Sequence, residues 1–139
     1  MAVNNNQVYG VNSYAVDLEH VPVQIFMNGA SSPTSCKGPF SPTCVRDAAG
    51  QYTLTLTGWN PKVVYGSHAI GVDAANLRDT RVDVEGSITI TNGSTKTVVV
   101  KFTVSNLAGT AKSPAANAGS YVLLSLWGKT YSGVDATQR

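Results

Sequence analysis

Apolar and polar side chains alternate with a period of two residues in several short segments of the chain. In Gln51–Thr57 the sequence Gln-Tyr-Thr-Leu-Thr-Leu-Thr places a tyrosine and two leucines on one face and threonines on the other. This is the pattern of a strand with one buried face. Residues 19–27, 62–67, 68–73 and 81–91 also have strand composition. We expect a break near Gly66 and a bulge at Gly86.

A β-hairpin is predicted around the Asn92-Gly93 pair. This pair separates Ser-Ile-Thr-Ile-Thr from Thr-Val-Val-Val-Lys-Phe-Thr-Val, and Asn-Gly between two strand-like runs is typical of a tight hairpin turn. The row Val98, Val99, Val100 predicts a strand that is covered on both faces. The near-continuous apolar run in residues 120–127 predicts the same, with the domain's own core on one face and another subunit on the other.

Two segments lack this alternation and are expected to be loops. Residues 30–50 contain Pro33, Pro39 and Pro42 among Ser, Thr and Gly, which predicts a long loop with at most a short extended piece around Phe40. Residues 105–119 predict a loop that crosses one end of a sandwich.

No segment has a helical period, so we expect an all-β fold: an antiparallel jelly-roll β-sandwich of about seven or eight strands. The Asn-rich residues 1–13 suggest an N-terminal arm. Residues 14–127 are expected to form the sandwich domain, and residues 128–139 a C-terminal tail.

Charge is scarce in this chain. Only 13% of the 139 residues are charged, whereas about a quarter is usual for soluble domains, which suggests a surface partly covered by other protein. The net charge is +2 and the basic residues are scattered, which argues against nucleic acid or an anionic membrane as a partner. There is neither a membrane-spanning apolar run nor a signal peptide at Met1, so we expect synthesis in a cytoplasm.

The two cysteines, Cys36 and Cys44, flank a turn-forming segment that contains Gly38, Pro39 and Pro42. This turn allows the two sulfurs to approach, so a disulfide and two free thiols are both open at this point. A bridge across so short a loop would stabilise the fold by about 2 to 3 kcal/mol. Because no histidine is near them in the sequence, the pair is not a zinc site.

Few residues offer catalytic or metal-binding chemistry. His20 and His68 are the only histidines, and neither lies in the setting of a nucleophile and its base. We therefore expect no enzyme, no cofactor and no metal. The acidic residues Asp73, Asp79, Asp83 and Glu85 would suit a calcium site only if Arg78 and Arg81 did not interrupt them. A solvated loop with local Asp–Arg ion pairs is the simpler interpretation.

Four pieces of the chain together resemble a recurrent bacteriophage module. They are Gly-Gln-Tyr-Thr-Leu-Thr-Leu-Thr-Gly at residues 50–58, the Val-rich strand pair, Ala-Gly-Thr-Ala-Lys-Ser-Pro-Ala at residues 108–115, and Gly-Ser-Tyr-Val-Leu-Leu-Ser-Leu at residues 119–126. The module is found in phage fibre and decoration proteins and is similar to the jelly roll of complement and tumour-necrosis-factor type. The resemblance covers roughly residues 50–127. It implies a homotrimer built through apolar strand faces.

The resemblance leads us to expect a non-enzymatic capsid decoration, or cement, protein on the virion surface, bound to the major capsid protein. A short chain that begins at its own Met, with no shaft before the module, favours this role over a tail fibre. The alternative is a tail-fibre or spike tip that binds a host-surface glycan through residues 30–50 and 105–119; a secreted enzyme or non-viral lectin is a weaker third. Trp59, Tyr65, Trp127 and Tyr131 would stack on sugars if exposed, although core or interface anchoring is more usual. Candidate trimer or capsid contacts are Val3, Val8, Tyr9, Val98, Val100, Tyr121, Leu123 and Trp127.

Overall fold

The computed structural model describes residues 18–75, 78–114 and 119–130. This part of the chain consists of eight strands joined by turns and loops, with no helix among the described residues. The predicted arm (residues 1–13) lies outside the described residues, as does the tail beyond Thr130. The strands are β1 (Leu18–Asn28), β2 (Ser31–Lys37), β3 (Thr43–Ala48), β4 (Gln51–Thr57), β5 (Pro61–Val72), β6 (Arg81–Asn92), β7 (Lys96–Ser105) and β8 (Tyr121–Thr130).

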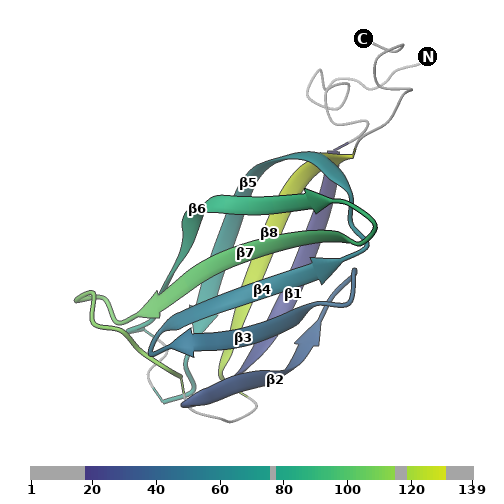
Figure 1. The fold of residues 1–139 in the computed structure, drawn as a ribbon. Helices are drawn as coiled ribbons and strands as arrows, with labels where there is room; N and C mark the ends of the chain where they lie inside the picture. Colours follow the sequence, from purple (N-terminus) through teal and green to yellow (C-terminus); the bar gives the residue numbers. More distant parts are fainter. Residues whose placement is uncertain (1–17, 76–77, 115–118, 131–139) are drawn as a thin grey trace.

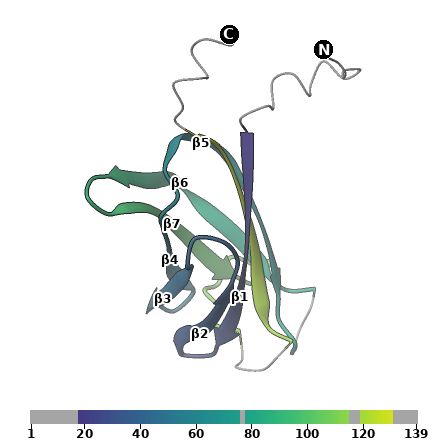
Figure 2. The same cartoon turned by 90° about the vertical axis from the view of Figure 1, so that its right-hand side faces the viewer.

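The strands form two four-stranded sheets with the orders β2-β1-β8-β5 and β3-β4-β7-β6. We call them the β1/β8 sheet and the β4/β7 sheet after their central strands. All pairings between neighbouring strands are antiparallel. Figure 1 shows the β4/β7 sheet in front of the β1/β8 sheet with the two sets of strands crossing, and Figure 2 shows the two layers from the side. The prediction of an all-β sandwich is confirmed.

The predicted hairpin joins β6 to β7. The Asn92–Lys96 pair closes it, so the loop contains residues 93–95 and is one residue longer than a two-residue turn. The predicted bulge also exists, because the pairing of β6 with β7 is irregular between Val84 and Ile88, on either side of Gly86. The two segments expected on either side of Gly66 are instead one strand, β5, whose pairing with β8 shifts between Val64 and Gly66.

Residues 30–50 are not a long loop, and this prediction is wrong. They contain β2 and β3, which are edge strands of different sheets. An edge strand tolerates proline because one side of it needs no hydrogen-bond donor. Pro33 lies where the pairing with β1 slips between Phe26 and Asn28, so the strand continues past it. Phe40 is not in an extended piece; it has a positive φ of 67° at the corner between the two strands.

The core lies between the sheets and follows the alternation along the central strands. Tyr52 stacks on Phe102 with ring centroids 5.3 Å apart. The indole of Trp59 is buried, stacks on Phe40, and donates a hydrogen bond from Nε1 to Glu19 Oε1 at 2.9 Å. Each large apolar side chain buried here contributes about 1.5 to 3 kcal/mol. The buried apolar residues are Val21, Val23, Ile25, Met27, Cys44, Tyr52, Leu54, Leu56, Trp59, Val98, Val100, Phe102, Val104, Val122, Leu124 and Leu126.

One end of the sandwich is closed by residues 105–114, as predicted for the first part of this loop. The Pro114 carbonyl accepts a hydrogen bond from Gly29 N, next to β1. The Ser113 hydroxyl accepts one from Arg46 Nε in β3. The Lys112 backbone N–H donates to Val104 O in β7. The segment therefore fastens both sheets to each other at this end.

Candidate functional site

The outer face of the β1/β8 sheet carries large apolar side chains on adjacent strands. Ile70 of β5 pairs with Leu123 of β8, and Val72 pairs with Tyr121. Directly paired residues of antiparallel strands share a face, so these four side chains form one patch. Leu123 is 40% exposed and Ile70 is 49% exposed. Two large side chains that lie side by side in this way expose a continuous apolar surface.

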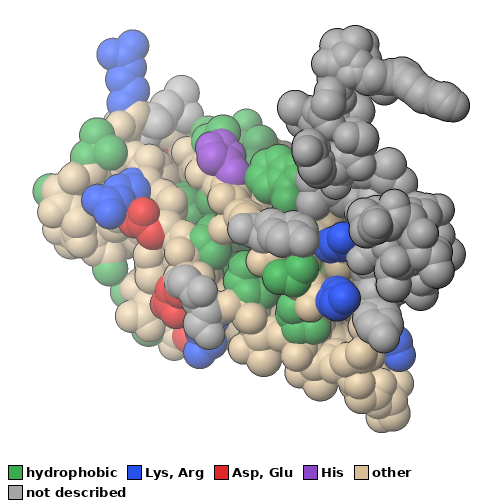
Figure 3. Space-filling view, turned by 90° about the horizontal axis from the view of Figure 1, so that it is seen from above, with side chains coloured by type: hydrophobic (Ala, Val, Ile, Leu, Met, Phe, Trp, Pro, Cys, Tyr) green, Lys and Arg blue, Asp and Glu red, His purple; other side chains and the backbone are tan. Residues whose placement is uncertain are grey.

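Aromatic rings extend this patch towards both ends of β1. His20 stacks on Trp127 with ring centroids 4.8 Å apart and an angle of 12° between the rings. Phe26 is covered by the Lys37 ammonium, 5.5 Å from the ring centroid. The view from above the molecule shows a histidine directly beside a group of hydrophobic side chains (Figure 3). We call the surface formed by Phe26, Ile70, Val72, Tyr121, Leu123 and Trp127 the apolar face.

A groove runs along the apolar face next to Leu123. It has a volume of about 390 Å³ and extends between β8 and the start of the corner after β2. Pro22, Pro39 and Leu123 contribute apolar walls, and Lys37 lies at its rim. Exposed apolar patches of this kind mark contacts with other molecules more often than isolated exposed leucines do.

The opposite sheet has a different character. The outward positions of β4 and β7 include Thr53, Thr55, Thr97 and Thr103, all partly exposed. Such a threonine-covered surface is compatible with water. The candidate docking surface is therefore the outer face of one sheet only.

The structure separates the predicted interface residues into three groups. Tyr121, Leu123 and Trp127 lie on the apolar face, with only their alternate neighbours Val122, Leu124 and Leu126 in the core. Val98 and Val100 are fully buried at 0% exposure, which corrects the expectation that they contact another subunit, because their side chains fill the domain's own core. The remaining three predicted residues, Val3, Val8 and Tyr9, lie outside the described residues.

Sequence reasoning missed Ile70, Val72 and Phe26 as members of the apolar face. The run His-Ala-Ile-Gly-Val in β5 does not indicate which side is buried, because the strand is irregular before Ser67. The pairing register with β8 decides it. A one-residue slip would exchange the two faces of a strand, so this information is not contained in β5 alone.

Of the four aromatic residues proposed as sugar platforms, the structure describes the side chains of two. Trp59 is only 2% exposed and belongs to the core. Trp127 has its ring stacked on His20. Tyr131 and the side chain of Tyr65 lie outside what the structure describes. His68 is exposed and is the cross-strand neighbour of Ser125 on the outer face.

The acidic residues are arranged differently from the predicted solvated loop. The exposed Arg81–Asp83 ion pair, 2.8 Å between Nε and Oδ2, fits that prediction. Asp73 does not, because it is buried and pairs with Lys112 at 2.9 Å. Burial raises the pKa of Asp73, but hydrogen bonds from Lys112 and Ala75 and the charge of Lys112 outweigh burial and hold the pKa below its ordinary value.

No metal centre is visible in the described part of the chain, where no three His, Cys, Asp or Glu side chains come together. The described residues also contain no helix with the length and apolar character needed to cross a membrane.

Both cysteines are free thiols in the structure. Cys36 in β2 and Cys44 in β3 lie on edge strands of different sheets, and the same edge is tied by a hydrogen bond from Arg46 N to Ser32 Oγ of 3.0 Å. Burial raises the pKa of the Cys36 thiol. Burial, followed by the nearby Cys36 and Asp47, raises the pKa of Cys44 to about 12.

These pKa shifts predict unequal thiol reactivity. Since the thiolate is the reactive form, we expect a maleimide at pH 8 to modify the half-buried Cys36 well before the buried Cys44. Peptide mass spectrometry of timed samples measures both rates, and the protein in denaturant is the control in which the two rates should converge. Equal rates in the folded protein would contradict the burial of Cys44.

Comparison of the chain with protein-family profiles, with curated proteins and with solved structures finds no match.

Proposed function

We propose that this chain is a non-enzymatic structural protein of a bacteriophage particle: a capsid decoration protein that assembles as a homotrimer through the apolar face. The observation that supports it best is the cross-strand pairing of Leu123 with Ile70 and of Tyr121 with Val72 on the outer side of the central strand β8 and the edge strand β5. The sequence resemblance to the phage module supplies the biological setting, with the virion surface as location and the major capsid protein as partner.

The strand pairing suits the jelly-roll interpretation. The first described strand pairs with the last, β1 with β8, and the inner pair β4 and β7 lies in the other sheet. A jelly roll is likewise a sandwich of two antiparallel sheets with eight strands in all. In this interpretation the apolar face is the surface around which three copies pack.

Burial of the apolar face is the energetic basis of the proposed assembly. Removing apolar surface from water contributes about 25 cal/mol per Å². A stable interface buries about 800 Å² on each partner. The aromatic and aliphatic side chains of the apolar face are of the types that dominate the binding energy of interfaces.

The first test is the mass of the protein in solution by light scattering. We expect three times the 14.6 kDa of the chain. Leu123→Glu should reduce this to the mass of one chain, because three copies of the variant would bury carboxylates against each other. Val45→Glu is the matched control: Val45 is 53% exposed but lies on the other sheet, so this variant should remain a trimer.

The second test concerns the particle. Phage shells that lack decoration should bind the trimer to saturation at a fixed ratio in a sedimentation assay, and the Leu123→Glu variant should bind much more weakly because three linked contacts become one. If the wild-type protein is a monomer in solution, the proposed trimer is wrong. A trimer that ignores bare shells leaves the assembly intact and rejects the capsid role.

A second candidate function is recognition of a host-surface glycan by a tail-fibre or spike tip. One observation favours it: a polar hollow at the end of the β4/β7 sheet is walled by parts of the two segments expected to bind glycan, residues 30–50 and 105–119. Binding of the isolated protein to host cells, blocked by free glycan, would be the expected result.

A further inference from the structure

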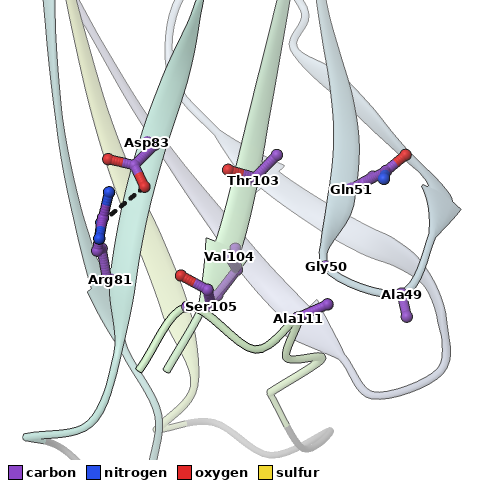
Figure 4. A pocket seen from close by; sticks show the side chains of 10 residues that line it. Ala49, Gly50, Gln51, Arg81, Asp83, Thr103, Val104, Ser105 and Ala111 are labelled. Atoms are coloured by element: carbon purple, nitrogen blue, oxygen red, sulfur yellow. Dashed lines mark ion pairs between the residues drawn. The ribbon is translucent and has the colours of Figure 1, made fainter. Parts of the chain in front are cut away.

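The polar hollow has a volume of about 290 Å³ and lies where β4 begins, β6 begins and β7 ends. Ala49 and Gly50 wall it on one side, and Gly109 and Ala111 close its end. Figure 4 shows Arg81 and Asp83 on one side, Thr103 and Ser105 of β7 in the middle, and Gln51 on the other side. The volume is close to the lower limit of about 300 Å³ that is typical of small-ligand sites.

Five polar side chains belong to two neighbouring rows of this sheet. Gln51 pairs with Thr103, and Thr103 pairs with Asp83. In the next row Ser105 pairs with Arg81. Because paired residues share a face, an amide, a carboxylate, a guanidinium and two hydroxyls lie on the same side of the sheet. They provide both donors and acceptors within one small hollow.

Small residues line the rest of the hollow. Gly50 and Gly109 have positive φ values of 69° and 92°, which favour glycine. Together with Ala49 and Ala111 they line the hollow with residues that have a short side chain or none. A Cβ at Gly109 would meet no atom within 4 Å, so glycine keeps this part of the wall open.

The charges in the hollow restrict the class of ligand. Arg81 and Asp83 form an ion pair of 2.8 Å, so their charges cancel. An anion would lie near the Asp83 carboxylate, and a cation near the Arg81 guanidinium. A neutral molecule with several hydroxyl groups avoids both problems, because it donates to the carboxylate and accepts from the guanidinium. The ion pair is half exposed, so rearranging it around a ligand costs little.

We propose that this hollow binds one neutral sugar residue of a glycan, with Asp83 and Arg81 contacting adjacent hydroxyls and with Gln51, Thr103 and Ser105 completing the contacts. The site is on the β4/β7 sheet and does not depend on assembly through the apolar face. The same site serves a decoration protein or a fibre tip.

The test is a titration of the isotope-labelled full chain, followed by amide chemical shifts, with the methyl glycosides of glucose, galactose, rhamnose and N-acetylglucosamine. We expect at least one of them to shift the amides of Gln51, Asp83, Thr103 and Gly109 with a dissociation constant of about 1 to 10 mM, as befits a single sugar with few contacts. If none of the glycosides shifts these amides at about 100 mM, the proposed site is wrong. A sugar with a dissociation constant of about 1 to 10 mM would nearly saturate the site at that concentration.

Asp83→Asn tests the proposed contact and should weaken binding about tenfold, because hydrogen bonds to a charged acceptor are the stronger ones. Asp47→Asn is the matched control: this carboxylate also lies on the β4/β7 sheet, where Thr53 Oγ1 donates to it, but it does not line the hollow. Equal binding by Asp83→Asn and wild type overturns the contact. Leu123→Glu should lose the trimer and keep the sugar shifts, which separates this proposal from the assembly.

Discussion

Replacing Lys112 with Met should reduce the free energy of unfolding by about 3 kcal/mol, since removal of one partner from a buried ion pair typically costs 3 to 5 kcal/mol. Each of the three N–H groups of the ammonium has an acceptor: Asp73 Oδ2 at 2.9 Å, Asp79 O at 2.7 Å and Thr80 Oγ1 at 3.0 Å. Without Lys112 the Asp73 carboxylate, only 6% exposed, keeps the hydrogen bond from Ala75 N but has no counter-charge.

Urea unfolding followed by tryptophan fluorescence measures this loss. Lys101→Met is the control, because Lys101 is exposed on the outer side of β7, and its loss should change stability by less than about 0.5 kcal/mol. The double variant Lys112→Met with Asp73→Asn should be more stable than the sum of the two single losses predicts, since it leaves no uncompensated charge. If the stability losses of the two single variants simply add in the double variant, Lys112 and Asp73 do not stabilise the fold as a pair.

The same ion pair gives the fold a pH dependence. The pKa of Asp73 is lowered in the folded state, so its contribution to stability is present above the unfolded-state pKa of about 3.9. This contribution is lost as the pH falls through the lower folded-state value. The wild type should therefore lose stability below about pH 4 more steeply than Asp73→Asn does.

The elements that could be predicted from the sequence are those whose local pattern agrees with their place in the fold. Gln51–Thr57 alternates strictly and forms β4, with Tyr52, Leu54 and Leu56 in the core. Asn92-Gly93 begins the hairpin loop between β6 and β7. In these segments the sequence spacing alone decides which side chains are buried.

The elements that could not be predicted depend on contacts far apart in the sequence. Prolines in residues 30–50 indicate a loop locally, but β2 and β3 form because β1 and β4 offer free edges. Three consecutive valines suggested cover on both sides of β7, yet Val98 and Val100 lie in the core while Val99 is only partly buried on the outer face. Threonine residues of the two neighbouring strands flank Val99 on that face.

The candidate site was predictable in part for the same reason. Tyr121, Leu123 and Trp127 could be found because β8 has more apolar residues than one face of a strand needs. Ile70 and Phe26 could be found only through pairing registers. The role of Lys112 had no sequence signal, since Asp73 is distant in the chain and the lysine lies in an irregular segment.

Replacing Gly50 with Ala should destabilise the protein by about 3 kcal/mol or more, the sum of a left-handed backbone and a steric clash. Gly50 has a φ of 69°, and a Cβ there would lie 2.5 Å from Val104 O and 3.0 Å from Lys112 N. Both atoms belong to backbone. Gly50 O accepts a hydrogen bond of 2.8 Å from Val104 N, and Val104 O accepts one of 3.0 Å from Lys112 N, so relieving the clash disturbs both bonds.

Gly58→Ala separates the two causes. Gly58 also has a positive φ, 97°, but nothing lies within 4 Å of the position of its Cβ, so this variant suffers backbone strain of about 1 to 2 kcal/mol without a clash. Urea unfolding of both variants gives the difference between their free energies of unfolding. We assign this difference to the close approach of the start of β4 to residues 105–114, which close this end of the sandwich. If Gly50→Ala proves no less stable than Gly58→Ala, the end of the sandwich is more loosely packed than the structure indicates.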